Sequence, residues 1–243
     1  SSLNPRKTVG RIVGRAMEKH DIATGDEKRE RVAELLERVG LSAAAAKKYP
    51  HEFSGGQQQR VAIAHALAVE PRLIVCDEPV SALDVSVQAQ ILNLLAEIQA
   101  DTGIAYLFIS HNIGVVRHIC DRVAVMYLGK IAEFGTIDQV FSAPFHPYTE
   151  SLLSAVPHAN PNRVTDRILL EGTVPSPIDP PSGCPFQTRC PKKLGDECEV
   201  NTPVLEDVGD GHEISCLLSV EEMSERESFI TPSTEEPAVG DSD

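Results

Sequence analysis

The 243-residue chain lacks a hydrophobic run long enough to cross a membrane and lacks a surplus of basic residues. A membrane-spanning helix takes about 20 consecutive apolar residues, and no stretch of the sequence approaches that length. Lysine and arginine total 22 against 36 aspartates and glutamates, a formal net charge of −14. Nucleic-acid-binding domains normally carry a basic face. The sequence therefore predicts no nucleic-acid partner, and we expect any connection with a membrane to run through another protein.

The sequence also lacks the glycine-rich loop with which many nucleotide-hydrolysing proteins hold a triphosphate. That loop reads G-x-x-x-x-G-K-[ST], and no window of the chain matches it. The single Gly-Lys pair, Gly129-Lys130, is followed by Ile131, and Ala124 occupies the place of the first glycine. Because the chain also opens on Ser1 and not on methionine, we expect it to be the C-terminal part of a longer polypeptide.

Half of the net charge lies at the C-terminal end. Residues 219–243 contain eight acidic side chains and one basic one, Arg226, which leaves −7 of the −14. The segment is rich in Ser, Pro and Glu and has little apolar surface to bury, so we expect residues 218–243 to form a disordered acidic tail. A high-salt cytoplasm is a second explanation for an acidic surface.

Residues 1–50 have the pattern of helices. Thr24 and Glu27 have the spacing of a capping box at a helix start, and Gly40 is placed to end that helix. One apolar stripe recurs at helical spacing between them. It consists of Val32, Leu35, Leu36 and Val39.

From residue 51 to residue 142, short apolar strands alternate with helices. The expected strands are 73–76, 105–109 and 122–128, and the expected helices are 54–69, 84–100 and 112–120. Continuous apolar strands separated by helices favour an α/β fold with a largely parallel sheet covered on both faces. Gly129-Lys130 should turn the last strand into a terminal hairpin with 131–134.

The character of the chain changes again beyond about residue 143. Prolines recur too often for long helices or strands, and four cysteines appear. We expect residues 143–217 to form a separate, small, loop-rich extension.

A candidate anion site begins the helix after residue 53. Ser54 is a favourable N-cap, and Gln57, three residues later, is its reciprocal partner in a capping box. Gly55 and Gly56 between them leave the first N–H groups of the helix unshielded, and the helix dipole adds to their attraction for an anion. Two adjacent glycines weaken a helix start, so we favour anion binding over a helix that merely tolerates glycine.

A second candidate site follows two of the expected strands. Asp77 and Glu78 end strand 73–76, and His111 follows strand 105–109. Open α/β sheets bind ligands at the carboxyl ends of their strands, so these side chains should share one edge. An aspartate there can hold Mg²⁺, and a neighbouring glutamate can orient or deprotonate an attacking water. The remaining histidines are more consistent with structural roles.

These motifs resemble those of the ATP-binding-cassette (ABC) ATPases. The segment 53–60, Phe-Ser-Gly-Gly-Gln-Gln-Gln-Arg, resembles their signature motif, and residues 73–78 resemble their Walker B strand. Residues 81–84 resemble the D-loop, and His111 resembles the switch histidine. The four motifs occur in the family's order, and the resemblance covers about residues 1–142. It implies a partial ABC ATPase fold, with a helical subdomain at 1–50 and an ATPase core at 51–142.

The resemblance implies a role for each motif. The signature motif of one ABC subunit closes over ATP held by another, so it should contact the γ-phosphate of ATP bound to a partner subunit. The residues of this signature motif that should make the contact are Ser54, Gly55, Gly56 and Gln57. In the chain's own site, Asp77 would bind Mg²⁺, Glu78 and His111 would be catalytic, and Ser81 and Asp84 would belong to the D-loop. The Walker A loop is missing, and residues 1–6 resemble the segment that follows the Q-loop. We therefore expect this chain alone not to hydrolyse ATP.

The extension narrows the resemblance to one subfamily. Residues 144–149, Pro-Phe-His-Pro-Tyr-Thr, and the segments around Cys184 and Cys190 are similar to the C-terminal extension of dipeptide and oligopeptide importer ATPases. This implies a second ATPase subunit, identical or different, membrane permease subunits and, indirectly, an extracytoplasmic solute-binding protein. It also implies a location at the cytoplasmic face of the membrane. Nickel and oligosaccharide importers share the extension and stay open as alternatives, as do a non-catalytic regulatory module and a redox or metal-sensing domain.

The cysteines fall into two groups. Cys76 and Cys120 lie in an apolar strand and an apolar helix and are expected in the core. The others are spaced C-x5-C-x7-C-x17-C, at Cys184, Cys190, Cys198 and Cys216. A cytosolic ATPase does not favour disulfides, and four thiolates in a segment with little core suggest a metal site. Spacing alone leaves structural Zn²⁺ and a [4Fe–4S] cluster open, although the tight C-x₂₋₄-C knuckle of zinc sites is absent. Some members of the resembled subfamily carry a [4Fe–4S] cluster on matching cysteines, which favours the cluster.

Overall fold

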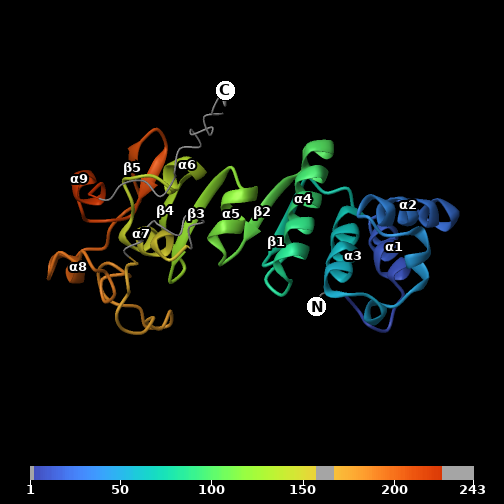
Figure 1. The fold of residues 1–243 in the computed structure, drawn as a ribbon, viewed down its shortest axis with the longest axis horizontal. Helices are drawn as coiled ribbons and strands as arrows, with labels where there is room; N and C mark the ends of the chain where they lie inside the picture. The colour runs from blue at the N-terminus through green and yellow to red at the C-terminus, as the bar shows by residue number, and fades with distance from the viewer. Residues whose placement is uncertain (1–2, 157–166, 226–243) are drawn as a thin grey trace, which may run out of the picture. The chain divides into compact units, whose positions relative to one another are not determined.

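The computed structural model describes residues 3–156 and 167–225 (Figure 1). Two compact units make up the chain, residues 1–111 and residues 112–243. Each unit combines helices with β-strands, which confirms the α/β class. Among the helices of the described residues, none is both long and apolar enough to cross a bilayer.

The first unit begins with the predicted helices. Helix α1 is Val9–Lys19, α2 is Gly25–Arg38 and α3 is Gly55–Leu67, with the 3-10 turns Ala43–Lys47 and Pro50–Glu52 between α2 and α3. Where the three helices face one another, the side chains of Val13, Leu36 and Val61 are fully buried. This burial of one apolar stripe on each helix is the main reason that such short helices are stable.

The two ends of α2 differ in how well the sequence predicts them. Gly40 lies just beyond the helix with φ = +74°, as expected for a glycine that ends it. The capping box expected at Thr24 is wrong, because the Thr24 side chain accepts no N–H group. Gly25 starts the helix at φ = +59°, and Glu27 forms an ion pair with Arg31 at 3.2 Å instead of reaching back to Thr24.

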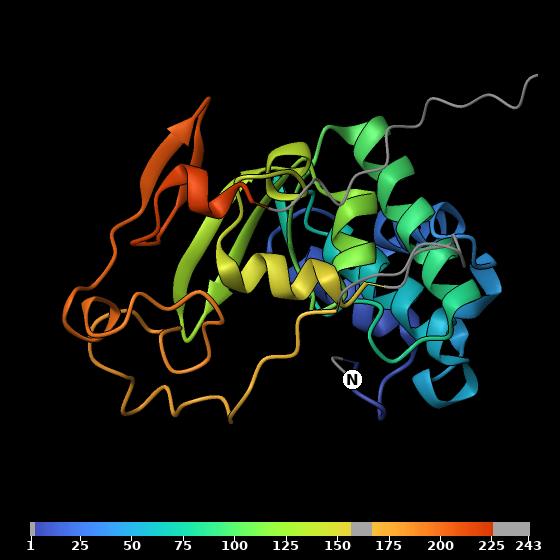
Figure 2. The same ribbon diagram turned by 60° about the vertical axis from the view of Figure 1, so that its left-hand side comes forward.

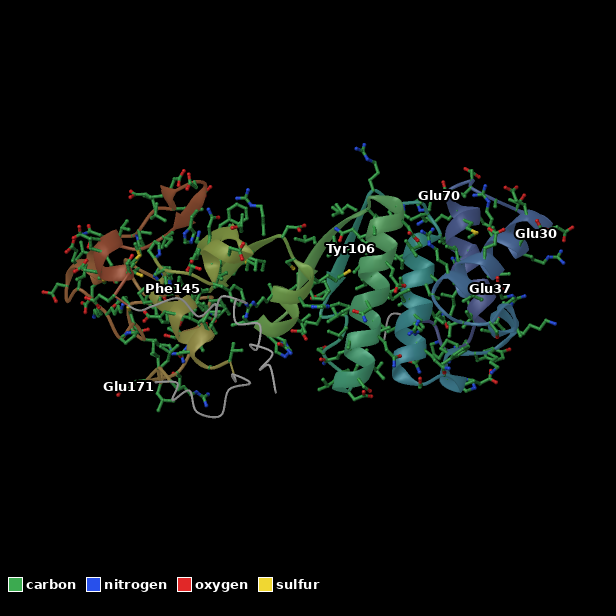
Figure 3. The ribbon with its side chains drawn as sticks, turned by 45° about the horizontal axis from the view of Figure 1, so that its top comes forward. Glu30, Glu37, Glu70, Tyr106, Phe145 and Glu171 are labelled. Carbon is green, nitrogen blue, oxygen red and sulfur yellow. The ribbon has the colours of Figure 1, made fainter. Side chains whose placement is uncertain are left out.

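A parallel strand pair forms the rest of the first unit. Strand β1, Leu73–Asp77, pairs with β2, Ala105–Ile109, so that Leu73 lies opposite Ala105 and Asp77 opposite Ile109. Helix α4, Val85–Thr102, connects them and ends at Gly103, which has φ = +68°. Tyr106 of β2, labelled in Figure 3, donates its hydroxyl hydrogen to the Leu95 carbonyl of α4 at 3.1 Å. The strand–helix–strand order follows the predicted periodicity.

One prediction about this sheet is wrong. Both faces were expected to be covered, but alternate apolar side chains of β1 and β2 are about half exposed in the described structure. They are Leu73 (54%), Val75 (57%), Leu107 (53%) and Ile109 (47%). Side chains alternate between the faces of a strand, so these four share one face. The opposite face packs into the unit, and Cys76 there is only 8% exposed.

The second unit is built on an antiparallel sheet. Its strands β3 (Arg122–Tyr127), β4 (Lys130–Thr136), β5 (Glu206–Gly209) and β6 (His212–Ile214) are arranged in the order β3-β4-β6-β5. The expectation that 122–128 joins the parallel sheet is therefore wrong. Leu128 and Gly129, at φ = +45° and +75°, turn β3 directly back into β4. The hairpin predicted at Gly129-Lys130 is confirmed, because β3 pairs antiparallel with β4. At its other edge β3 pairs with no strand of the described residues.

Short helices surround this sheet. They are α5 (Ile113–Ile119), α6 (Ile137–Val140), α7 (Pro147–Ser154), α8 (Glu197–Val200) and α9 (Val220–Met223). Thr136 and Gln139 cap α6 reciprocally. Figure 2 shows irregular loop for most of the described stretch between α7 and α8, as the proline content predicts.

The beginning of the expected disordered tail is ordered. Met223 in α9 is 3% exposed, and its carbonyl accepts the N–H of Phe145 at 3.2 Å. Phe145, labelled in Figure 3, is fully buried in a cluster with Phe141 and Leu153. The expectation of disorder from residue 218 is wrong for this segment, because it supplies an apolar side chain to the unit. Residues 226–243 lie outside the described residues.

A buried carboxylate links β4 with the start of α7. Glu133 has no exposed surface; its Oε1 lies 2.9 Å from Nε2 of His212, and its Oε2 accepts the N–H of His146 at 2.9 Å. Burial raises the pKa of Glu133, and the hydrogen bond with His212 opposes that rise. His146 caps α7 by accepting the N–H of Tyr148 on Nδ1 at 3.0 Å. Burial lowers the pKa of His146 to about 4, so its ring is neutral in the folded state.

The low pKa of His146 predicts a pH dependence of stability. Between its ordinary value of 6.5 and about 4, the unfolded chain binds a proton at this residue and the folded chain does not. The contribution of the buried neutral His146 to the free energy of unfolding is therefore fully present above pH 6.5 and is lost as the pH falls toward 4. In His146→Asn, the side-chain oxygen can still cap the helix. We expect this variant to lose about 2 kcal/mol less free energy of unfolding than the wild type between about pH 7 and about pH 5. Urea titrations at both pH values test this, and equal losses in the two proteins would contradict it.

Candidate functional site

The motif at residues 54–57 forms the N-terminus of α3. The Ser54 hydroxyl accepts the N–H of Gln57 at 3.4 Å, and the Gln57 side-chain oxygen accepts the N–H of Ser54 at 3.1 Å. This is the reciprocal capping box that the sequence predicts. The N–H groups of Gly55 and Gly56 lie in the first turn, where a helix offers them no acceptor of its own. Ser54, Gly55 and Gln57 are exposed, so the tip is accessible to an anion from outside the unit.

The two glycines of the tip have different surroundings. A Cβ atom on Gly56 would lie 2.4 Å from Cγ1 of Val87 on α4, a distance that real contacts do not allow. A Cβ atom on Gly55 would lie 3.3 Å from Cδ2 of Leu83, at the end of a flexible side chain. Gly56 therefore has a packing reason that the sequence did not reveal, whereas Gly55 is the position at which the open tip can be altered.

Glu78 and His111 meet at the carboxyl ends of β1 and β2. Nδ1 of His111 lies 2.9 Å from Oε1 of Glu78, although the two residues are 33 positions apart in the sequence. The N–H of Glu78 also donates to the carbonyl of Ile109 at 2.9 Å. The structure therefore brings together two side chains that the sequence places at one edge of the sheet.

The backbone and charge of Glu78 fit a reactive position. Its φ of +45° lies in the left-handed region, which costs a non-glycine residue of order 1 kcal/mol or more and recurs at functional sites. The hydrogen bond from His111 lowers the pKa of Glu78, so the carboxyl group is ionised at neutral pH. Its side chain is 46% exposed and that of His111 is 72% exposed. An ionised, accessible carboxylate can accept a proton from water.

The segment 81–84 joins Glu78 with α4. The Ser81 hydroxyl donates to the carbonyl of Glu78 at 3.1 Å. Asp84 is the N-cap of α4: its Oδ1 accepts the N–H of Val87 at 2.9 Å and the hydroxyl of Ser86 at 2.7 Å. The hydrogen bond from Ser86 is the main cause that lowers the pKa of Asp84. Asp84 therefore has a clear structural role, which its position before a helix, D-x-S, could have indicated.

Asp77 ends β1 with an exposed side chain. Within residues 3–156 and 167–225, no three side chains among His, Cys, Asp and Glu are arranged to hold a metal ion. Mg²⁺ in nucleotide sites commonly takes only one or two protein carboxylates and completes its shell with phosphates and waters. One carboxylate at the end of β1 is compatible with that chemistry.

The cysteines of the extension gather around one apolar cluster. Cys184 and Cys198 are buried in it together with Tyr127 and Phe186, and Cys190 packs against it. The N–H of Cys184 donates to the carbonyl of Cys198 at 2.8 Å. The backbone is so close here that a Cβ atom on Gly183 would lie 2.4 Å from that carbonyl oxygen. The six cysteines all lie in the described residues, and no two of them form a disulfide.

Backbone N–H groups are directed at three of these sulfurs. Burial raises the pKa of Cys184, of Cys190 to about 12 and of Cys216 to about 11. Hydrogen bonds from nearby backbone N–H groups act in the opposite direction and favour the thiolate. The donors are Phe186 and Gln187 for Cys184, Lys192 for Cys190, and Leu217 and Leu218 for Cys216. The four thiols also affect one another's ionisation: Cys184, Cys198 and Cys216 each contribute to the raised pKa of Cys190.

Two family models match the chain. The first, ABC transporter, matches residues 1–81, and the second, oligopeptide/dipeptide transporter, C-terminal region, matches residues 132–198. A putative peptide import ATP-binding protein of Brucella ovis is 49% identical over 217 residues, which cover 89% of this chain and 68% of that protein. The chain belongs to the ABC transporter ATP-binding family. It carries that family's oligopeptide/dipeptide C-terminal region.

Other relatives of this ABC chain are longer than the chain itself. The oligopeptide transport ATP-binding protein OppF of Escherichia coli K12 is 52% identical over 220 residues. The dipeptide transport ATP-binding protein DppF of Haemophilus influenzae is 51% identical over 217 residues. The matches cover 89% of this chain but only 65% of OppF and 66% of DppF, just under two thirds of their length.

Solved ABC structures share the fold. CbiO1 of Clostridium perfringens, part of the ABC transporter complex cbiONQ, is 33% identical with a TM-score of 0.50 and covers 58% of this chain and 55% of its own. The ATP-binding cassette MJ0796, solved as a dimer in a post-hydrolysis state with ADP and phosphate, is 33% identical with a TM-score of 0.50. It covers 57% of this chain and 60% of its own. These matches confirm the ABC ATPase fold expected from the four motifs.

Proposed function

We propose that this chain is part of the ATP-binding subunit of an ABC importer for dipeptides or oligopeptides. The pair formed by Glu78 and His111, 2.9 Å apart at the ends of two parallel strands, carries the ATPase half of the proposal. The names of the relatives support the peptide half. Residues 1–50 then form the helical subdomain, residues 51–142 the ATPase core and residues 143–217 the importer-type extension.

The chain's own residues divide the work at the ATP site. Glu78, ionised and accessible, accepts the proton of the water that attacks the γ-phosphate of ATP. His111 fixes the orientation of that carboxylate through Nδ1, which leaves Nε2 to contact a phosphate oxygen. Asp77 would hold Mg²⁺, which would neutralise charge on the phosphates.

The helix tip serves a different ATP molecule. The Ser54 hydroxyl, the Gln57 amide and the backbone N–H groups of Gly55 and Gly56 offer hydrogen-bond donors at the positive end of α3. Together they bind the γ-phosphate of ATP held by a second ATPase subunit. Two such subunits, identical or different, enclose ATP between them and drive a pair of permease subunits. An extracytoplasmic solute-binding protein delivers the peptide. The chain then works at the cytoplasmic face of the membrane.

Uptake by the reconstituted importer tests this function. The complete subunit, assembled with its permease in lipid vesicles, is expected to accumulate labelled di- or oligopeptides when ATP is supplied on the cytoplasmic side. If the vesicles accumulated nickel or an oligosaccharide but no peptide, the proposed peptide substrate would be wrong. Peptide uptake without ATP hydrolysis by this subunit would assign the chain a regulatory role.

We also propose that the extension binds a [4Fe–4S] cluster through Cys184, Cys190, Cys198 and Cys216. Two observations support the fit. N–H donors face three of the sulfurs. Tyr127, which is buried in the same cluster as Cys184 and Cys198, has a hydroxyl with no hydrogen-bond partner among the described residues. A single Zn²⁺ requires its thiolates within about 4 Å of one another, since each lies about 2.3 Å from the metal. In the described residues no three His, Cys, Asp or Glu side chains are arranged to hold a metal ion, so the proposal is supported by the two observations above and by the cysteine spacing. A cubane holds its four thiolates farther apart, at its corners. Such a cluster would supply bonds that brace a loop-rich segment.

Metal analysis of anaerobically purified protein tests the cluster. The wild type is expected to contain about four iron and four sulfide per chain and to absorb visible light. Cys184→Ser should lose most of both, whereas Cys76→Ser, in the first unit, should retain them. Colourless protein that contains zinc would contradict the proposal.

A further inference from the structure

Tyr127, at the end of β3, buries a hydroxyl group that nothing in the described structure satisfies. The residue is 6% exposed, and its hydroxyl oxygen has no hydrogen-bond partner among the described residues. Leaving a hydroxyl unpaired in the interior destabilises the fold, and phenylalanine would fill the same space without that cost. The hydroxyl therefore needs a hydrogen-bond partner that the described residues do not provide.

The ring of Tyr127 is held firmly in place. It packs edge-on against Phe186, with ring centroids 5.1 Å apart and an interplanar angle of 78°. It also packs edge-on against Tyr148, at 4.9 Å and 64°. Two aromatic neighbours in this arrangement restrict the ring, so the position of the hydroxyl is set by the fold.

The polar atoms packed in and against this cluster are sulfurs and the hydroxyl of Tyr148. The buried residues packed with Tyr127 are Cys184, Phe186 and Cys198, and Cys190 lies at the edge of the cluster. A neutral thiol is a weak acceptor, whereas a metal-bound thiolate or an inorganic sulfide carries negative charge and accepts a stronger hydrogen bond. Backbone N–H groups of Phe186 and Lys192 are also directed at the sulfurs of Cys184 and Cys190.

We propose that the Tyr127 hydroxyl donates a hydrogen bond to a sulfur of the bound cluster and thereby raises the reduction potential of that cluster. The inference rests on the proposed [4Fe–4S] cluster. Reduction adds an electron to the iron–sulfur core, and a hydrogen-bond donor stabilises the extra negative charge. Tyr127 is thus a positioning and tuning residue, and it takes no part in ATP hydrolysis.

The substitution Tyr127→Phe tests the role of the hydroxyl. It keeps the ring and removes only the donor. In anaerobic dithionite titrations of the full chain, followed by electron paramagnetic resonance, we expect the ratio of reduced to oxidised cluster at a given potential to fall about tenfold, the equivalent of one hydrogen bond to a charged group. Tyr148→Phe is the matched control. It removes the same group from the half-buried neighbouring ring and should leave the ratio unchanged.

A second readout separates this role from simple packing. Without the cluster, Tyr127→Phe removes an unpaired buried hydroxyl and is expected to unfold at the same or a higher urea concentration than the wild type. A less stable cluster-free variant would show that the hydroxyl bonds within the fold, and would overturn the inference. An unchanged ratio in the cluster-loaded variant would overturn it as well and leave the cluster itself in place. Wild-type protein without iron and sulfide would overturn both.

Discussion

Replacing Glu78 with glutamine in the complete subunit is expected to lower ATP turnover about 10²–10⁴-fold, the range for loss of a general base. ATP binding should change little, because glutamine has the same shape and can keep a hydrogen bond with His111. The reason lies in the geometry: Glu78 is held by His111 at 2.9 Å, is ionised because that bond lowers its pKa, and is exposed to an attacking water. Turnover and nucleotide affinity, measured on the same preparation, check the expectation.

Glu70→Gln is a suitable control for this substitution. Glu70 is also an exposed glutamate of the first unit with a left-handed backbone, at φ = +49° against +45° for Glu78. Its carboxylate forms an ion pair with Arg31 at 2.9 Å on the surface, where such pairs contribute little. Turnover should stay near that of the wild type. If Glu78→Gln turned over ATP as fast as Glu70→Gln, Glu78 would not be the base.

Replacing Gly55 with glutamate is expected to abolish most ATP turnover while leaving the fold intact. The new carboxylate would lie at the positive end of α3, where acidic side chains stabilise a helix, but it would repel the γ-phosphate. Its Cβ atom would meet only the flexible end of Leu83, at 3.3 Å. Loss of one preorganised donor site for a reacting oxyanion costs about 10²–10³-fold in rate, and we expect a loss of that order in the assembled complex.

Gly55→Gln isolates the effect of charge, because glutamine and glutamate have the same size. This variant should lose much less activity than Gly55→Glu, and both should unfold at similar urea concentrations. Equal losses in the two would indicate that the position is sensitive to size and not to charge. Gly56 is unsuitable for the same experiment, since any side chain there collides with Val87 at 2.4 Å.

Local signals in the sequence predicted the parts of the site that depend on local chemistry. Ser54 and Gln57 cap α3 because their spacing allows two reciprocal bonds, and that spacing is visible in the sequence. Glu78 and His111 meet because both follow buried strands, and parallel neighbours end at one edge. In both cases a periodic pattern or a short motif in the sequence was sufficient to predict which side chains lie together.

Other features depend on partners that no local pattern reveals. The sequence predicted the hairpin of β3 with β4, but β3 is as apolar as β1 and β2, and no local pattern showed that it stays out of their parallel sheet. The contact of Gly56 with Val87 joins two helices and has no signature in either. Tyr127 is one apolar strand residue among several, and only the packing around it shows that its hydroxyl is buried.

The central claim is that the tip of α3 and Glu78 of one subunit serve different ATP molecules. Two tandem fusions of the complete subunit, each carrying one Glu78→Gln and one Gly55→Glu substitution, test it directly. When the two substitutions are in different copies, we expect one intact ATP site and measurable ATP turnover. With both in the same copy, each site is damaged and turnover should be near zero. The reverse ranking, with turnover only when both substitutions share a copy, would show that the tip acts within its own subunit and would contradict the account.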